Sequence, residues 1–370
     1  MNQVLTPSLR FEEFQDNWEL KNLKDVFELK YGKDHKHLNQ GIYPMLGSGG
    51  IMRYVDSYLY NQPSVLIGRK GTIDKPLFIT TPFWTVDTLF YTIIKQGQEP
   101  YFVYSLAQTI NWYKYNEATG VPSLNTSGIY SVPVYVPLIK EQQKIASCLT
   151  SVDSKISQLT EKHRLLKEYK KGVMQQIFSQ QLRFKDEDGK AFPKWKIERI
   201  GKYLEAYKEL VSVNTEIPIL TSSRTGLYPQ ERSVINEGSY GVVPLGYFTY
   251  RHMSDDLVFK FNVNRTWDRG AVSKEYPVFK TVGMDCYFLE LQLNEGNDFK
   301  KFAIQQKQGG TRTRLYFKNL TELKLNTPCL KEQQKISQFL QSIDKKIDTV
   351  EQQVEQTKQF KKGLLQQMFV

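Results

Sequence analysis

PLIKEQQKI, at Pro137–Ile145, returns 191 residues later as PCLKEQQKI at Pro328–Ile336. KKGVMQQIF (170–178) likewise returns as KKGLLQQMF (361–369), and 19 of the 42 positions from 137 to 178 are identical without a gap. This period is far longer than a solenoid unit, so each half is expected to be a whole domain followed by a helix. The chain is therefore interpreted as a tandem duplication whose function is carried out twice.

The repeated segments are predicted to be long helices. Their apolar residues recur at alternating steps of four and three, which is the pattern of a coiled coil. Each follows a proline that suits a helix start, and about 40 residues would make a rod roughly 60 Å long. We expect the two helices to pair antiparallel about a pseudo-twofold axis rather than each packing only on its own domain. The residues expected to pair them are Ile145, Leu149, Val152, Ile156 and Leu159 in the first copy and Ile336, Leu340, Ile343, Ile347 and Val350 in the second.

A lysine interrupts both seams at the same place, Lys170 in the first copy and Lys361 in the second. Either the lysines extend out of the interface to solvent, or the contact ends there and another protein takes over. Gly172 and Gly363 follow, and each weakens a helix by about 1 kcal/mol. The repeated glycine suggests a bend or the close approach of a partner.

The segments before the helices read as mixed, β-rich domains whose sequences differ. Leu-Arg-Phe at 9–11 recurs at 182–184, and Trp18 recurs as Trp195. Short stretches rich in β-branched and aromatic residues then alternate with glycine and proline turns, which predicts strands. A helical stretch at 100–115 has a candidate counterpart at 298–306. The expected α+β organisation is an N-terminal segment at 1–17, a first domain at 18–137, a helix at 138–180, a linker at 181–194, a second domain at 195–328 and a helix at 329–370.

The composition favours a polyanionic partner. Lys and Arg number 50 against 39 Asp and Glu, a net charge of +11, and 22 tyrosines and 21 phenylalanines add stacking surface. The three scattered cysteines do not suggest a disulfide framework. The chain has no signal-peptide pattern at its start and no apolar run of about 18 residues, so we expect a soluble, cytoplasmic protein.

Catalytic signatures are weak. The glycine-rich LGSGG at 46–50 lacks the spacing of a phosphate-binding loop and is interpreted as a turn. His35 and His37 have no third metal ligand at a recognisable spacing. No Pro-Pro pair is present for a base-gripping methyltransferase motif. Nuclease-like groupings of acids with a lysine are interpreted as chance: Asp298 with Glu322 and Lys324, and Asp16 with Glu19 and Lys21. We expect no catalytic and no metal site.

Together these elements resemble the specificity subunit of type I restriction–modification systems. The resemblance is carried by the paired KEQQKI…KKGxxQQxF segments, by YPMLGSGGI…VLIGRKGTI at 43–73 and by the TGxxxLNxxxI pattern at 119–129. It implies two target-recognition domains, each reading one half of a split DNA site. It also implies paired helices that set the spacer and dock two modification subunits, with restriction subunits joining the full enzyme. S-adenosylmethionine, ATP and Mg²⁺ are then expected on those partners and not on this chain.

The residues expected to bind DNA are mostly basic. Arg69 and Lys70 lie between two glycines on a tight turn, where an arginine can read guanine and a lysine more often holds phosphate. The second domain lacks this motif, and its best candidate is KQGGTRTR at 307–314. The candidates are Arg53, Tyr54, Arg69, Lys70, Thr72, Lys114 and Asn116 in the first domain and Arg224, Arg251, Arg265, Arg269, Arg312 and Arg314 in the second.

Two alternatives stay open at this point. One is a stand-alone DNA methyltransferase or nuclease with an unrecognised active site. The other is a coiled-coil scaffold that attracts DNA only through its charge, which would give uniform, salt-dependent binding without a consensus sequence.

Overall fold

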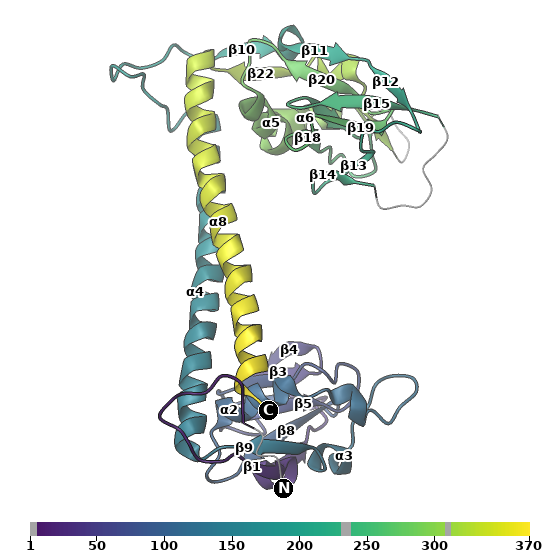
Figure 1. The fold of residues 1–370 in the computed structure, drawn as a ribbon. Coiled ribbons are helices and arrows are strands. Elements are labelled where there is room, and N and C mark those ends of the chain that lie inside the picture. Colours follow the sequence, from purple (N-terminus) through teal and green to yellow (C-terminus); the bar gives the residue numbers. More distant parts are fainter. Residues whose placement is uncertain (1–5, 231–237, 308–311) are drawn as a thin grey trace. The chain divides into compact units, whose positions relative to one another are not determined.

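The computed structural model describes residues 6–230, 238–307 and 312–370. The chain divides into two compact units, the first made of Met1–His163 with Thr349–Val370 and the second of Arg164–Asp348. Figure 1 shows that each unit combines a β-rich module with one end of each of two long helices. Lys307 is described, but the neighbouring Gly309 and Gly310 of the predicted basic loop lie outside the described residues.

The two long helices predicted from the repeat are present as α4 (Ile139–Phe178) and α8 (Leu330–Met368). Of the ten predicted seam residues, Val152 and Ile156 are half-buried and the other eight are buried. Around Gly172 and Gly363, the glycines after the lysines, no atom of the described residues outside the adjacent turns of the same helix lies within 4 Å of the place where a Cβ would stand. Close packing within this chain therefore does not explain either glycine.

The module of the first unit is built around a four-stranded antiparallel sheet with strand order β2-β8-β5-β6. A three-stranded sheet, β4-β3-β7, and a two-stranded ladder, β1-β9, complete it. Its strands are β1 (Glu19–Asn22), β2 (Phe27–Tyr31), β3 (Gln40–Gly47), β4 (Gly50–Val55), β5 (Ser64–Gly68), β6 (Leu77–Ile79), β7 (Trp84–Thr85), β8 (Leu89–Ile94) and β9 (Pro133–Val136). Its short helices are α1 (Leu23–Val26), α2 (Pro100–Thr109), η1 (Trp112–Tyr115) and α3 (Thr126–Tyr130).

The module of the second unit repeats this plan with a four-stranded antiparallel sheet in the order β11-β20-β16-β18. It also has a three-stranded sheet, β12-β15-β19, and the ladders β10-β22, β13-β14 and β17-β21. Its strands are β10 (Lys196–Arg199), β11 (Leu204–Tyr207), β12 (Leu210–Ser212), β13 (Leu220–Ser222), β14 (Leu227–Pro229), β15 (Ser239–Pro244), β16 (Phe248–Tyr250), β17 (Met253–Ser254), β18 (Phe261–Val263), β19 (Arg269–Ser273), β20 (Val278–Thr281), β21 (Thr313–Arg314) and β22 (Lys324–Thr327). Its helices are η2 (Ile200–Tyr203), α5 (Cys286–Glu295), α6 (Asn297–Gln305) and α7 (Phe317–Leu320).

The counterpart of α2 is α5, and the prediction that it lies at 298–306 is wrong. The backbone N–H that precedes each helix donates to a glutamine of a long helix, from Glu99 to Gln142 at 3.0 Å and from Asp285 to Gln333 at 2.9 Å. The segment at 298–306 is helical, but it belongs to α6. The propensity pattern found a helix there, and only the contacts reveal which helix occupies the equivalent place.

The core of the first module takes in the end of α8 (Figure 1). Phe369 stacks on Phe102 with ring centroids 5.3 Å apart and meets the edge of Trp18 at 6.4 Å. Ile145 and Leu149 of α4 belong to the same buried cluster. The first turns of α4 therefore pack on their own module as well as on the other helix.

The second module receives the end of α4 in the same manner. Phe178 and Trp195 both approach the ring of Phe288 edge-on, at 6.2 and 6.3 Å. Ile336 and Leu340 of α8 share this buried cluster. Each module is thus packed against the start of the helix that follows it and the end of the other helix.

Candidate nucleic-acid interface and helix junctions

The turn after β5 holds Arg69 and Lys70 on a rigid backbone. A Cβ at Gly68 would lie 2.0 Å from the carbonyl oxygen of Thr72, and Gly71 has a φ of +88°, so both positions require glycine. The N–H of Arg69 donates to Thr88 at 2.8 Å. This confinement fixes the directions in which the Cα–Cβ bonds of the two basic residues leave the turn.

Arg69 is half-buried, and two contacts hold its guanidinium. Its Nη1 donates to the carbonyl of Asp87 at 3.2 Å, and its guanidinium carbon lies 5.5 Å from the ring centroid of Tyr31. Lys70 is exposed and Thr72 is half-buried beside it. A stacked, pre-oriented guanidinium of this kind suits bidentate contact with a base edge.

The other candidates of the first module are less uniform. The amide of Asn116 donates to Ala118 and accepts from the N–H of Ser123, both at 2.8 Å, so it organises its own loop. Lys114 is exposed on η1. Arg53 donates to two backbone carbonyls, while Tyr54 beside it on β4 is 51% exposed. The predicted turn at 46–50 is confirmed, because it joins β3 to β4.

In the second module, four candidate arginines gather around the β17-β21 ladder. Arg314 stands opposite Met253 on that ladder. Arg312 is ion-paired with Asp255 at 2.9 Å, and Arg224 with Asp256 at 2.6 Å. Arg251, which is exposed, lies two residues before the ladder.

Charges and burial around the β17-β21 ladder, which forms one edge of the module, set the protonation states there. The hydrogen bond from Arg224, followed by that from Ser254, lowers the pKa of Asp256 to about 2. His252 stacks on Tyr316 at 5.9 Å, and burial lowers its pKa, so the imidazole is neutral at pH 7. The positive charge of this edge is therefore carried by arginines.

The turn that holds Arg69 and Lys70 in the first module and the start of the β17-β21 ladder in the second occupy the same place in their modules. We call them the two reading edges. The N–H of Leu124 donates to the carbonyl of Arg69 at 2.9 Å, and the N–H of Leu315 donates to that of His252 at 2.8 Å. β5 and β16, which precede the two turns, both hold the third position in their four-stranded sheets. The segment at 251–254 is thus the counterpart of 68–71, although their sequences share nothing that would reveal it.

Arg265 and Arg269 lie apart from this edge. Arg269, on β19, pairs with Glu209. Arg265 pairs with Glu290, and its guanidinium lies 5.9 Å from the ring centroid of Tyr287. Arg224 and Arg312 are also paired with carboxylates, so it is their position away from the β17-β21 ladder that makes Arg265 and Arg269 the weaker DNA candidates of this module.

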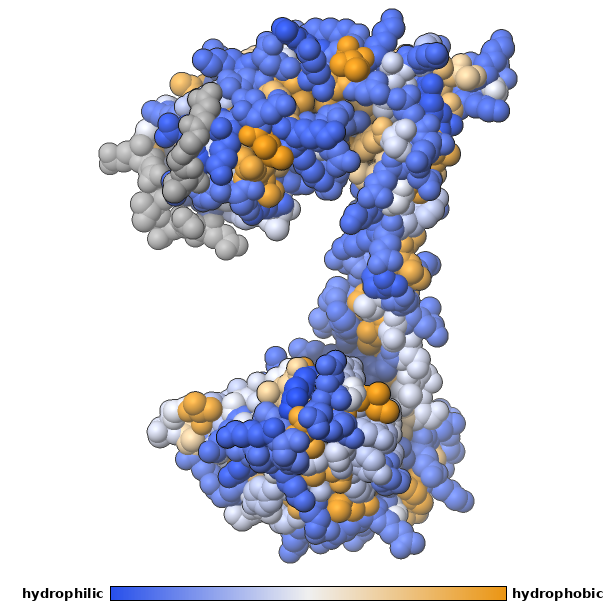
Figure 2. Space-filling model, turned by 180° about the vertical axis from the view of Figure 1, so that it is seen from behind, coloured by the Kyte–Doolittle hydropathy of each residue, from blue (hydrophilic) through white to orange (hydrophobic). Residues whose placement is uncertain are grey.

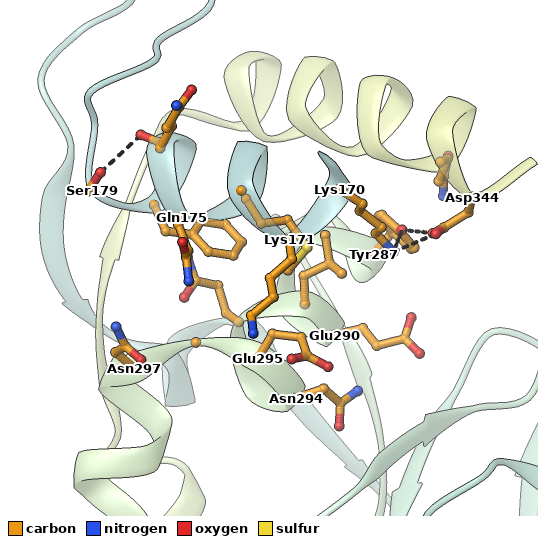
Figure 3. A pocket seen from close by; sticks show the side chains of 18 of the residues that line it. Lys170, Lys171, Gln175, Ser179, Tyr287, Glu290, Asn294, Glu295, Asn297 and Asp344 are labelled. Atoms are coloured by element: carbon orange, nitrogen blue, oxygen red, sulfur yellow. Dashed lines mark hydrogen bonds and ion pairs between the residues drawn. The ribbon is translucent and has the colours of Figure 1, made fainter. Parts of the chain in front are cut away.

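Arg265 lines a groove of about 1900 Å³ within the second unit. Figure 3 shows Lys171 extending into this groove on the side where Glu290 and Glu295 lie. Its charge is mixed, so the groove alone does not indicate a phosphate site. Its other basic residues are Lys167, Lys170, Lys260, Lys300, Lys301 and Lys345, and its other acidic residues are Asp298, Asp344 and Asp348.

The repeated KEQQ sequence builds matching junctions at the starts of both long helices. Glu141, whose side chain is 2% exposed, accepts from Arg10 at 2.7 Å and from the indole of Trp18 at 3.2 Å. Glu332, 1% exposed, accepts from Arg183 at 2.7 Å and from the indole of Trp195 at 3.0 Å. The following glutamines are also buried and donate to the carbonyls of the preceding prolines.

These junctions explain why the repeat is so well retained at its ends. Sequence reasoning used it only as evidence of duplication and did not assign Glu141 or Glu332 a role. The sequence did contain a signal for this role. The repeated Leu-Arg-Phe segment and the repeated tryptophan supply the arginine and the indole that each glutamate binds.

Both interpretations of the seam lysines are wrong. Lys361 is ion-paired with Asp153 of α4 at 2.8 Å, and Lys170 with Asp344 of α8 at 2.5 Å. Their side chains are only 14% and 19% exposed. The lysines neither reach solvent nor mark the end of the helix contact, because each finds a carboxylate on the other helix.

The surface is predominantly hydrophilic on the face that Figure 2 presents, with small apolar patches scattered over it. Across the described ranges, no three His, Cys, Asp or Glu side chains are grouped as a metal ion would require. None of the described helices combines the length and apolar character needed to cross a membrane.

Comparison with known proteins points to one family. The model of the type I restriction modification DNA specificity domain matches residues 15–168 and 279–359, more than half of the chain. The specificity subunit of the type I restriction enzyme EcoprrI from Escherichia coli is 22% identical over 165 residues. That match covers 42% of this chain and 41% of the relative, so it spans less than half of the relative's length.

Two solved structures share the fold. The type I restriction-modification S subunit from M. genitalium gives a TM-score of 0.66 at 12% identity and covers 99% of both chains. A chain from a study of complex assembly and conformational transition of the type I R-M system gives a TM-score of 0.50 at 12% identity, covering 95% of this chain and 96% of that one. At this identity the likeness establishes the fold alone.

Proposed function

Because this chain belongs to the family of type I restriction–modification DNA specificity domains, we propose that it is the sequence-reading subunit of such an enzyme. Each β-rich module recognises one half of an asymmetric, bipartite DNA site. One observation carries the proposal: the four-stranded sheets of the two modules have corresponding strand orders, with β5 and β16 in the same position. The turn after β5 bears Arg69 and Lys70, whereas the turn after β16 bears Arg251. A common frame with different reading edges yields two different half-sites.

The two edges are suited to base reading as well as to phosphate contact. The surplus of 11 positive charges supplies attraction to any DNA. Sequence discrimination needs oriented side chains at base edges. Arg69, stacked on Tyr31, and the arginines around β17-β21 provide such groups.

The long helices, in this proposal, form an antiparallel coiled coil with pseudo-twofold symmetry and set the spacer between the half-sites. The support is that Asp153–Lys361 and Asp344–Lys170 join α4 to α8 in the same antiparallel register. Forty residues of helix extend roughly 60 Å, which is ample for readers one DNA turn, about 34 Å, apart. The helix surfaces that remain exposed dock two modification subunits, and restriction subunits join the full complex.

The chain itself is proposed to be non-catalytic. S-adenosylmethionine, ATP and Mg²⁺ belong on the partner subunits, and this chain contributes sequence recognition and geometry. A purified chain that methylated or cleaved DNA unaided would instead establish a stand-alone methyltransferase or nuclease.

Selection of DNA from a random-sequence pool tests the proposal. The purified chain, alone and with its modification subunits, should recover one consensus made of two unlike half-sites around a fixed number of unread base pairs. Recovery of no consensus, with binding that falls uniformly as salt rises, would reduce the chain to a charged scaffold.

A further inference from the structure

Two clusters of polar side chains lie where the modules meet the long helices. In the first unit, the hydroxyl of Tyr101 on α2 donates to the carboxylate of Asp153 on α4. The ammonium of Lys361 on α8 donates to the same carboxylate at 2.8 Å. One carboxylate therefore ties the module to both helices.

The second unit contains the same arrangement with the helices exchanged. The hydroxyl of Tyr287 on α5 donates to Asp344 on α8, and Lys170 on α4 donates to Asp344 at 2.5 Å (Figure 3). Lys170 also lies 3.3 Å from the tyrosine hydroxyl. The aspartates and the lysines are each separated by the repeat period of 191 residues, so the duplication preserved both clusters.

The clusters are largely shielded from solvent. The lysine side chains are 14% and 19% exposed, and burial raises the pKa of both tyrosines, which therefore remain protonated donors. A lysine in an apolar seam is tolerated only where a carboxylate stands opposite, because an unpaired charge there is costly. Polar residues in such seams are known to specify one register at some cost in stability.

Neither of the two registers one heptad away from the observed one satisfies both lysines. If α8 were displaced by seven residues along α4, Lys361 would face Ala146 or Thr160 in place of Asp153. In the first case Lys170 would face Ser337, and in the second Glu351. Either displacement, roughly 10 Å along the helix, leaves at least one lysine without a carboxylate opposite.

We propose that the two Tyr–Asp–Lys clusters are positioning devices that lock each recognition module onto the helix pair in a single register, so that the half-sites are read at one spacing only. This inference rests on the proposed function. The tyrosines are needed for this role because the Asp–Lys ion pairs join only the two helices. The tyrosine hydroxyls connect each module to the same aspartate.

The test is a spacer-tolerance measurement on the full chain with its modification subunits. The half-sites selected by the wild-type chain are placed in DNA with spacers one or two base pairs shorter or longer. Tyr101→Phe and Tyr287→Phe each remove one hydrogen bond to a charged group, and discrimination against the wrong spacers should fall about tenfold. The half-site sequences should not change.

Tyr104→Phe is the matched control. Tyr104 lies on the same helix as Tyr101, is also half-buried and stacks on Phe78 at 5.3 Å. Because Tyr104 is not part of the Tyr–Asp–Lys cluster, the Tyr104→Phe variant should discriminate between spacers as the wild-type chain does.

A charge exchange provides the second measurement. Asp153→Lys should relax the spacing or weaken assembly, and adding Lys361→Asp should restore it because the ion pair is rebuilt in reverse. If the tyrosine variants keep wild-type spacer discrimination while both half-sites are still recognised, the lock is refuted and the proposed function stands. If the wild-type chain selects no pair of half-sites, the proposed function itself fails.

Discussion

Removing Arg183 should destabilise the second module far more than removing an arginine from a surface ion pair. Arg183 holds Glu332 by two hydrogen bonds, Nε–Oε1 at 3.1 Å and Nη2–Oε2 at 2.7 Å, and the glutamate side chain is 1% exposed. In Arg183→Met the carboxylate keeps only the indole of Trp195 as a donor among these groups. A buried charge left without its partner costs about 3–5 kcal/mol of the free energy of unfolding.

Urea denaturation followed by tryptophan fluorescence measures this cost. The matched control is Arg199→Met, since the Arg199–Glu322 pair is 63% and 57% exposed and should contribute less than about 1 kcal/mol. Adding Glu332→Gln to Arg183→Met should recover much of the loss, because the buried charge is gone. Equal losses for Arg183→Met and Arg199→Met would refute the assignment of Glu332 as a buried, guanidinium-dependent junction.

Three further outcomes are expected. Gly71→Ala strains a residue at φ +88° by roughly 1–2 kcal/mol and should weaken binding to the first half-site only; equal weakening at both half-sites in DNA-binding titrations would contradict this. The folded-state pKa of Asp256 is lowered to about 2, so its contribution to stability is present above the unfolded pKa of about 3.9 and is lost as the pH falls toward 2. NMR titration of the Asp256 carboxyl should show the lowered pKa, and Arg224→Ala should raise it. A titration curve that Arg224→Ala leaves unchanged would rule out the Arg224–Asp256 ion pair as the cause. Replacing Val152 and Ile343 together with Asp should abolish assembly with the modification subunits, and normal co-purification would mean that the helices do not meet there.

The helices could be predicted because their information is local and repeated. A period of 3.5 residues, a proline at each start and the KEQQ echo suffice to place α4 and α8 within two residues of their ends. The turn at 46–50 could likewise be predicted from its glycines. These features depend on neighbours in the sequence, which is why sequence reasoning reaches them.

The reading edges could not be matched from sequence, because their equivalence depends on strand order and not on residue type. Arg69 and His252 both accept a backbone hydrogen bond from the leucine of the shared frame, yet nothing in GRKG resembles RHMS. The lysine partners were missed for a related reason. Asp153 and Asp344 are adjacent to seam positions in sequence, and only the antiparallel pairing places them opposite Lys361 and Lys170.

Exchange of one module shows whether the two modules read DNA separately. Residues 19–136 would be replaced by the corresponding segment of another family member, and the DNA site recognised with the modification subunits would be determined by mapping methylated bases. If each module reads its own half-site, one half-site should change while the other half-site and the spacer stay as they were. A change in both half-sites would show that the two modules do not read DNA independently.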